Sequence, residues 1–209
     1  MDIQNYWNKF YKEICDDKYQ TVPSQFAIFV LNELITNNIT SLVEYGCGTG
    51  KDAIFFSSND ICVYAYDSST SAIEFARRRS EKLGQPVTFN HITDFSETKP
   101  LVRKNNDRIC IYTRFFIHAL DNNSIIAFLD HLESTYNKGD ILMSEFRITG
   151  DDDGFRETED HFRNFIMPEI LINKLESKGF SMQYSISGTG MAKFKRDDAL
   201  VMRIIAIKI

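Results

Sequence analysis

The segment VEYGCGTGKD, which runs from Val43 to Asp52, carries the clearest structural pattern in the chain. The apolar run SLVEY over residues 41–45 predicts a short strand, and three glycines at alternate positions predict a tight turn that opens a helix. Glycine adopts positive φ angles at little cost and lets a ligand approach the backbone closely. The stretch therefore predicts a strand, a glycine turn and a helix, with a ligand bound over the turn.

The rest of the chain repeats this alternation of strand and helix. Helices are expected at about 5–14, from Ser24 after Pro23, at 51–57, from a capping box at Ser71 and Glu74 to Gly84, at 122–136, and from Pro168 to Lys178. Strands are expected at about 41–45, 61–66, 87–90, 108–113, 141–146, 180–187 and 199–208. Because no helix separates the last two strands, they should form a C-terminal hairpin. The pattern predicts an α/β, Rossmann-like seven-stranded sheet, mostly parallel with one antiparallel strand and with helices on both faces.

Composition excludes several classes of protein. The 209 residues carry 24 basic and 29 acidic side chains, a net charge of −5, so the basic field of a nucleic-acid-binding protein is missing. We expect one domain over 1–209, with a helical cap at 1–38 and a core at 39–209. No apolar run approaches the ~20 residues that span a bilayer, and the polar start predicts no signal peptide, so no membrane partner is expected. Four dispersed cysteines predict no metal site and a reducing cytoplasm (Cys15, Cys47, Cys62, Cys110).

Two aspartates follow the next two predicted strands. Asp67 stands seventeen residues after Gly50, where a carboxylate can accept the ribose hydroxyls of an adenosine bound over the turn. Asp94 follows the third strand and can accept from the adenine amino group, with Phe95 against the base. The alternatives are a helix-capping role for Asp67 and a solvated loop for Asp94. A nicotinamide dinucleotide is disfavoured, because Lys51 stands where the GxGxxG motif has its third glycine.

These features resemble those of class I S-adenosylmethionine-dependent methyltransferases. The resemblance covers about residues 41–146 and rests on VEYGCGTG, Asp67, Asp94 and the strand ICIYT before Arg114. It implies S-adenosyl-L-methionine as cofactor and S-adenosyl-L-homocysteine as product. It also implies that the glycine turn and the acid before it hold the methionine part, while an N-terminal aromatic residue covers the cofactor. The expected cofactor-binding residues are Tyr11, Glu44, Gly46, Cys47, Gly48, Gly50, Asp52, Asp67, Ser68, Asp94, Phe95 and Thr113.

Four further segments look like a narrower subgroup of that family. They are WNKFYKE, PSQFA, RFFIHAL and GMAKFKRDDALVMRIIAIK. The subgroup is encoded among genes of capsule and other polysaccharide biosynthesis, and includes enzymes of capsular methyl phosphoramidate assembly. This resemblance implies a phosphorylated or sugar-linked acceptor.

The acceptor is expected at the ends of the fourth and fifth strands. If the segment after the fourth strand is helical, Arg114 and His118 lie one turn apart and face one pocket. His118 and His161 are the candidate bases, although positioning alone can accelerate transfer from an activated donor. Arg114, Arg147 and Arg163 are the candidate ligands of an anionic acceptor, because guanidinium groups match phosphate oxygens.

The segment near 147–167 is long and polar enough to form a lid over the acceptor, although a solvated loop is the alternative. It contains Asp151, Asp152 and Asp153, whose consecutive side chains cannot easily converge on a metal ion, so no metal is expected.

The sequence therefore predicts a cytoplasmic methyltransferase that methylates an oxygen of a small acceptor. One alternative is N-methylation of a small amine or amino sugar. Another is a noncatalytic protein that binds S-adenosylmethionine. Nucleic acid is not the expected partner, because no Asn/Asp-Pro-Pro-Tyr/Phe motif follows the fourth strand.

Overall fold

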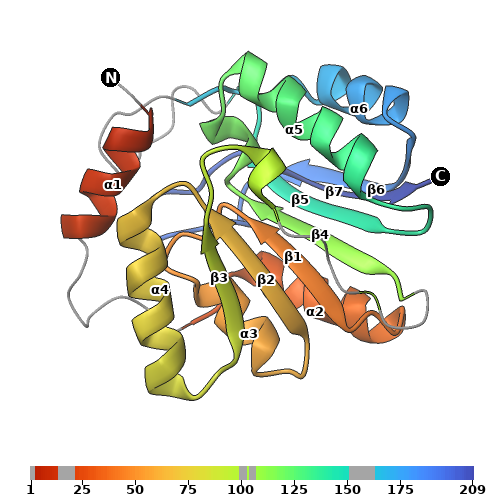
Figure 1. The fold of residues 1–209 in the computed structure, drawn as a ribbon. Helices are drawn as coiled ribbons and strands as arrows, with labels where there is room; N and C mark the ends of the chain where they lie inside the picture. The colour runs from red at the N-terminus through yellow and green to blue at the C-terminus, as the bar shows by residue number, and fades with distance from the viewer. Residues whose placement is uncertain (1–2, 14–21, 99–102, 104–106, 151–162) are drawn as a thin grey trace. The chain divides into compact units, whose positions relative to one another are not determined.

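A computed structural model describes residues 3–13, 22–98, 103, 107–150 and 163–209 of the chain. These residues contain a seven-stranded sheet with strand order β3-β2-β1-β4-β5-β7-β6 (Figure 1). The strands are β1 (Ser41–Tyr45), β2 (Cys62–Asp67), β3 (Val87–His91), β4 (Ile109–Arg114), β5 (Ile141–Arg147), β6 (Phe180–Gly188) and β7 (Val201–Lys208). The helices are α1 (Ile3–Glu13), α2 (Gln25–Thr36), α3 (Lys51–Ser57), α4 (Thr70–Leu83), α5 (Asn122–Thr135) and α6 (Pro168–Ser177), with 3-10 turns η1 (Phe95–Glu97) and η2 (Ile117–Ala119).

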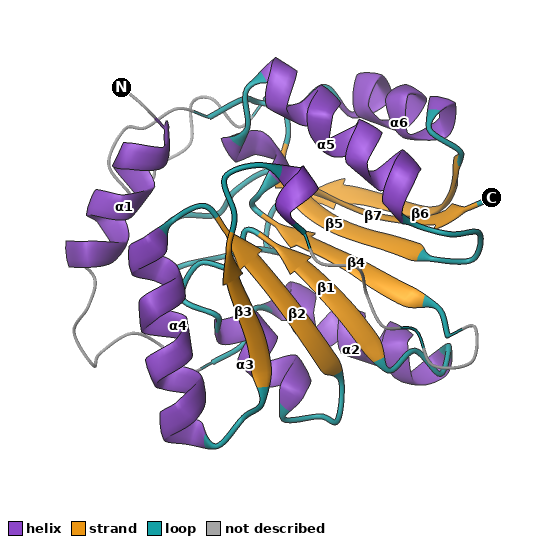
Figure 2. Cartoon of the chain, viewed as in Figure 1, coloured by secondary structure: helices purple, strands orange, loops and turns teal. Residues whose placement is uncertain are grey.

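The directions of the strands confirm the predicted sheet. β1 and β2 pair in parallel, as do β2 and β3, whereas β7 is antiparallel to both β5 and β6. Helices lie around the sheet (Figure 2). The fold is therefore α/β, with one antiparallel strand contributed by the C-terminal hairpin. None of the described helices is long and apolar enough to cross a membrane.

The chain divides into two compact units, Met1–Ile111 and Tyr112–Ile209. In the first unit, Ser24 begins α2 as predicted, because its hydroxyl accepts from the backbone N–H of Ala27 at 3.0 Å. The capping box predicted at Ser71 is wrong. α4 begins two residues earlier, where the Ser69 hydroxyl accepts from the N–H of Ala72 at 3.2 Å. Gly84 ends α4 in the left-handed conformation, as its position predicted.

In the second unit, the hairpin of β6 and β7 fixes the place of the segment that joins them. Val201, the first residue of β7, pairs with Arg147, the last residue of β5. The connecting residues 189–200 therefore reach the carboxyl end of β5, the end at which ligands bind on such sheets. Pro168 opens α6 as predicted. Of the predicted lid at 147–167, residues 151–162 lie outside the described part of the chain.

Candidate active site

The glycine turn between β1 and α3 has the predicted conformation. Gly46, Gly48 and Gly50 have φ angles of 74°, 52° and 71°, all in the left-handed region that favours glycine. The backbone N–H groups of Gly46 and Cys47 both donate to the carbonyl of Tyr66 in β2, at 2.8 and 3.1 Å. The turn is thereby held against the end of β2, next to Asp67.

Asp67 connects this turn to the start of α4. Its Oδ2 accepts from the N–H of Gly48 and its Oδ1 from the N–H of Ser69, both at 2.8 Å. Burial raises the pKa of Asp67, and the two backbone donors partly oppose that effect. Each carboxylate oxygen has a second lone-pair site. Asp67 can therefore also accept hydrogen bonds from the hydroxyl groups of a ligand.

Tyr11 of α1 lies over the glycine turn. A Cβ atom built on Gly48 would lie 2.6 Å from the Tyr11 hydroxyl oxygen, and Trp7 stacks on the Tyr11 ring with centroids 5.8 Å apart. Asn8 of the same helix accepts from the Ser69 hydroxyl at 2.9 Å. Burial, followed by the charge of Asp67, raises the pKa of Tyr11 well above its ordinary value. Tyr11 therefore covers the turn as a protonated hydroxyl.

Two further residues of the turn region, Glu44 and Cys47, are 3% and 6% exposed. Burial is the main reason that the pKa of Cys47 is well above its ordinary value, and Asp67 and Glu44 add to the effect. The thiol stays protonated and is therefore no nucleophile.

Three other predicted cofactor ligands make contacts within the fold. Asp52 accepts from the backbone N–H and the hydroxyl of Ser24, at 2.8 and 2.7 Å, and both of its oxygens thereby hold the start of α2. Asp94 begins η1, where its Oδ1 accepts from the N–H of Ser96 at 2.8 Å. Thr113, fully buried in β4, donates its hydroxyl proton to Ser144 of β5 at 2.6 Å.

Two more predicted cofactor ligands, Ser68 and Phe95, lie at the ends of β2 and β1. The Ser68 carbonyl is 3.0 Å from Nε2 of His91, and the Phe95 ring meets the edge of Tyr45 at 6.1 Å between centroids.

These residues fit an adenosyl cofactor. The left-handed turn presents backbone next to a buried acid, Glu44, and Asp67 retains capacity to accept ribose hydroxyls. Tyr11 closes the turn from above. Asp67 would hold the ribose. The glycine turn and Glu44 would hold the methionine part, and Tyr11 would cover the bound cofactor.

The predicted acceptor residues gather in the second unit. Glu145 of β5, whose side chain is fully buried, receives Nε of Arg114 on Oε1 at 2.9 Å and Nε of Arg203 on Oε2 at 2.8 Å. Phe115 has a φ angle of 54°, which is uncommon for an aromatic residue, and its ring centroid lies 4.4 Å from the Arg114 guanidinium carbon. The condition under which Arg114 and His118 would lie one helical turn apart is therefore not met, because a left-handed residue separates the end of β4 from η2.

His118 does not have the geometry of a general base. It is 5% exposed, and its Nδ1 accepts from the backbone N–H of Arg147 at 3.1 Å. A neutral imidazole that accepts at Nδ1 carries its proton on Nε2, so neither nitrogen offers a lone pair to an acceptor. This geometry lets His118 hold the end of β5 and argues against its expected role as a base. His161 lies outside the described residues.

Arg147 and Arg163 complete the acceptor group. Arg147 is 6% exposed, and its guanidinium donates to Oδ2 of Asp197 at 2.8 Å. Arg163 is half-buried in a segment that meets this region, since the N–H of Asn164 donates to the His118 carbonyl at 2.7 Å. No sequence pattern had pointed to Asp197, Glu145 or Phe115 as site residues. A charged residue inside the apolar strand ILMSEF was the available signal for Glu145.

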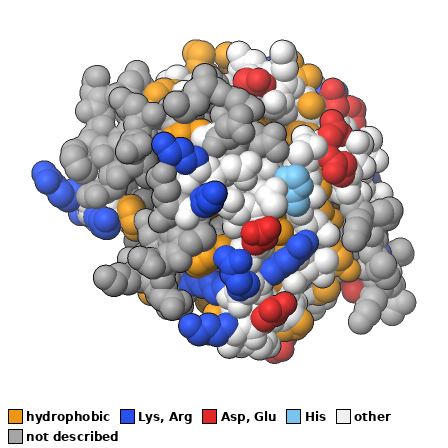
Figure 3. All heavy atoms as spheres, turned by 60° about the vertical axis from the view of Figure 1, so that its left-hand side comes forward, with side chains coloured by type: hydrophobic (Ala, Val, Ile, Leu, Met, Phe, Trp, Pro, Cys, Tyr) orange, Lys and Arg blue, Asp and Glu red, His pale blue; other side chains and the backbone are white. Residues whose placement is uncertain are grey.

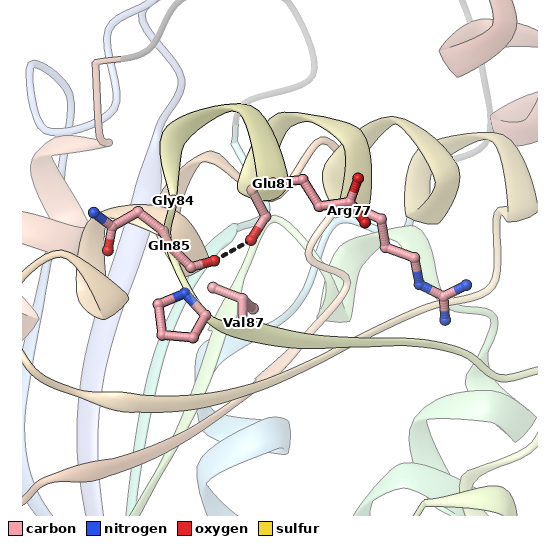
Figure 4. Close-up of a pocket in the computed structure, with 7 residues that line it drawn as sticks. Arg77, Glu81, Gly84, Gln85 and Val87 are labelled. Carbon is pink, nitrogen blue, oxygen red and sulfur yellow. Dashed lines mark hydrogen bonds between the residues drawn. The ribbon is translucent and has the colours of Figure 1, made fainter.

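The first unit also contains a groove at the amino end of β3 (Figure 4). Asp67 and Asp94 lie at the opposite end of the strands, so neither residue lines the groove. It has a volume of about 320 Å³ and lies between the end of α4 and the start of β3, where Ser80 donates to the Gln85 carbonyl. Arg77 and Arg78 of α4 are exposed, whereas Arg79 is partly buried, so the run of three arginines is not solvated throughout. Figure 3 turns the α1 and α4 side forward and shows basic side chains with acidic ones between them.

Comparisons with known proteins concern the domain and the fold. Residues 42–139 match the family model of a methyltransferase domain. No curated protein matches the chain.

Three solved structures illustrate the structural likeness. Magnesium protoporphyrin IX methyltransferase from Synechocystis PCC 6803, with bound S-adenosylmethionine, is 13% identical, with 100% of this chain and 98% of that chain covered and a TM-score of 0.71. An S-adenosylmethionine-dependent methyltransferase from Clostridium acetobutylicum ATCC 824 is 12% identical, with coverages of 97% and 98% and a TM-score of 0.66. A structure from work on the conversion of a disulfide bond into a thioacetal group during echinomycin biosynthesis is 12% identical, with coverages of 99% and 92% and a TM-score of 0.75. At these identities the likeness shows the Rossmann-like fold.

Proposed function

We propose that this chain is a methyltransferase that uses S-adenosylmethionine, as the match of residues 42–139 to a methyltransferase domain supports. We further propose that it methylates an oxygen of a small anionic or sugar-linked acceptor. The observation that carries the proposal is the charge at the carboxyl ends of β4 and β5. Three arginines and two carboxylates meet there, which leaves an excess of one positive charge (Arg114, Arg147, Arg203, Glu145, Asp197). A partly desolvated positive site favours an anionic ligand, because Coulomb interactions strengthen away from water.

The chain's own residues have distinct parts in this proposal. S-adenosylmethionine supplies a methyl group already activated on a sulfonium. Asp67 binds the ribose, the glycine turn and Glu44 orient the methionine part, and Tyr11 excludes water from above. Arg114 and Arg163 hold the anionic group of the acceptor. Arg147, whose guanidinium is bound by Asp197, contributes its charge.

Positioning supplies the rate in this mechanism. Since His118 Nδ1 is committed to the Arg147 backbone, we do not assign it a proton-transfer step. Holding donor and acceptor in a reactive geometry can lower a barrier by about 7–11 kcal/mol. His161 keeps its predicted role as a candidate base.

A place in capsule or related polysaccharide biosynthesis is the narrower proposal. It is supported by the resemblance of WNKFYKE, PSQFA, RFFIHAL and the C-terminal segment to that subgroup, and by the positive site, which suits phosphorylated sugars. The cytoplasm is the compartment that we propose, because the dispersed cysteines favour a reducing environment.

The test is the release of S-adenosylhomocysteine from S-adenosylmethionine in the presence of pooled sugar phosphates and glycosides. We expect release with the phosphorylated pool and little with neutral amines. Arg114→Lys should weaken use of the phosphorylated acceptor, because lysine keeps the charge and loses the planar fork, while cofactor affinity stays unchanged. Lys138→Arg, an exposed change in the same unit, is the control. Release with amines alone would contradict O-methylation, and tight cofactor binding with no release in any pool would favour a noncatalytic role.

A further inference from the structure

Asp197 lies in the segment that joins β6 to β7. This segment reaches the carboxyl end of β5, because Val201 pairs with Arg147. The backbone around Asp197 is closed by reciprocal bonds with Phe194, at 2.8 and 2.9 Å. Asp197 is therefore held in place at the end of the sheet where the acceptor is expected.

The two oxygens of its carboxylate are in different situations. Oδ2 accepts from the Arg147 guanidinium at 2.8 Å. Oδ1 is buried, and among the described residues none donates a hydrogen bond to it. The residue as a whole is 6% exposed. A buried acceptor without a donor is costly, so an oxygen in this state calls for a hydrogen-bond donor from outside the fold.

The surrounding charges limit the kind of donor that fits. Arg147 already neutralises Asp197, and the neighbouring set of Arg114, Glu145 and Arg203 carries one net positive charge. An ammonium group would meet this positive charge, whereas a neutral hydroxyl would not. The arrangement favours a hydroxyl as the donor to Oδ1.

We infer that Asp197 Oδ1 is the binding site for a hydroxyl group of the methyl acceptor. The inference rests on the proposed function and deepens it, since it selects a hydroxyl over an amine. It makes Asp197 a residue that determines specificity.

Two side chains that pack against residues of this region are less buried than Asp197. Phe115 and Met191 are only partly buried and pack against the cluster of Ala192, Ala199 and Val201, which flanks Asp197 in the sequence. Phe115 also holds a left-handed backbone conformation, and such strained residues concentrate at ligand sites.

Two matched probes test the inference by binding alone. They are 2-hydroxyethyl phosphate and 2-aminoethyl phosphate, which share the anionic group and differ only in hydroxyl against ammonium. Their dissociation constants are measured by ligand-observed NMR on the full chain saturated with S-adenosylhomocysteine. We expect the wild type to bind the hydroxyl probe at least about tenfold more tightly than the amine, because one hydrogen bond to a charged group is at stake.

Asp197→Asn should weaken binding of the hydroxyl probe about tenfold or more. Asp198→Asn is the control, because it removes the same charge from the exposed neighbour, whose Oδ1 accepts from the N–H of Gly190. Equal binding of both probes by the wild type, binding of neither, or unchanged binding by a folded Asp197→Asn protein would overturn the inference. The wild-type comparison stands even if the variant does not fold. Failure of S-adenosylhomocysteine itself to bind, measured separately by calorimetry, would instead overturn the proposed function.

Discussion

Replacing Gly48 by alanine tests whether Tyr11 really covers the glycine turn. Gly48 has a φ angle of 52°, and a left-handed alanine costs about 1–2 kcal/mol. The new Cβ would also lie 2.6 Å from the Tyr11 hydroxyl, while ordinary contact begins at 3.4 Å, so the ring must retreat by about 0.8 Å (3.4 − 2.6). Overpacking of this kind adds about 1–3 kcal/mol. We expect a total loss of about 2–5 kcal/mol in the free energy of unfolding.

Gly84 provides the matched control. It has a φ angle of 64°, but a Cβ there meets nothing within 4 Å. Gly84→Ala should therefore cost only the backbone part, about 1–2 kcal/mol. In a Tyr11→Ala background, the loss of unfolding free energy caused by Gly48→Ala should fall to the same value, because the clash has been removed.

The assay is urea-induced unfolding. The wild type, Gly48→Ala, Tyr11→Ala and the Gly48→Ala/Tyr11→Ala double variant form a double-mutant cycle, and Gly84→Ala is measured beside them as the control. The expected coupling between Gly48 and Tyr11 is about 1 kcal/mol or more. Equal losses for Gly48→Ala and Gly84→Ala, or a Gly48→Ala loss that does not change when Tyr11 is removed, would refute the contact.

Three further predictions concern the charged and titratable groups. Asp67→Ala should weaken the binding of S-adenosylhomocysteine by about 1.5–3 kcal/mol in calorimetry, which is the size of a hydrogen bond to a charged group. Asp107→Ala, at an exposed position, is the control and should leave binding unchanged. If Asp67→Ala also leaves the affinity unchanged, the ribose contact lies elsewhere. His118→Ala should lower the free energy of unfolding by about 1–3 kcal/mol, because the buried Arg147 N–H loses its acceptor. His118→Asn should retain most of the turnover. A ~10²-fold fall in the turnover of a stable His118→Asn protein would instead show that His118 is the general base. The pKa of Cys47 is raised in the folded state, so the folded protein holds that proton longer, and unfolding stability should fall as pH rises from 8 to 9.5, by at most about 1.4 kcal/mol per pH unit. Cys47→Ala should flatten this slope, and an equal slope in both proteins would contradict the burial of the thiol.

Local signals were enough to predict most of the fold. β1 and α3 have the predicted bounds, because an apolar run and a glycine turn determine them within ten residues. The sequence placed the start of α4 two residues too late, because serine at position 69 or 71 could begin a helix. The choice between them depends on Asp67, which accepts from the N–H of Ser69. A capping box does occur, at Asp94 and Glu97, where the sequence had suggested a ligand.

The site was harder to predict, because its contacts join distant parts of the chain. Asp52 binds Ser24, 28 residues away, and Arg147 binds Asp197, 50 residues away. Nothing local distinguishes such a buried, paired arginine from one that is open to a ligand. The left-handed conformation of Phe115 was equally hidden, since neither neighbouring residue is a turn former.

The central claim is that the glycine turn and Asp67 bind an adenosyl cofactor rather than a dinucleotide. Isothermal titration calorimetry with S-adenosylhomocysteine and with NAD, on the same preparation of the full chain, tests it most directly. We predict micromolar binding of S-adenosylhomocysteine, about 8 kcal/mol, and no measurable binding of NAD. Tighter binding of NAD than of S-adenosylhomocysteine would contradict the account.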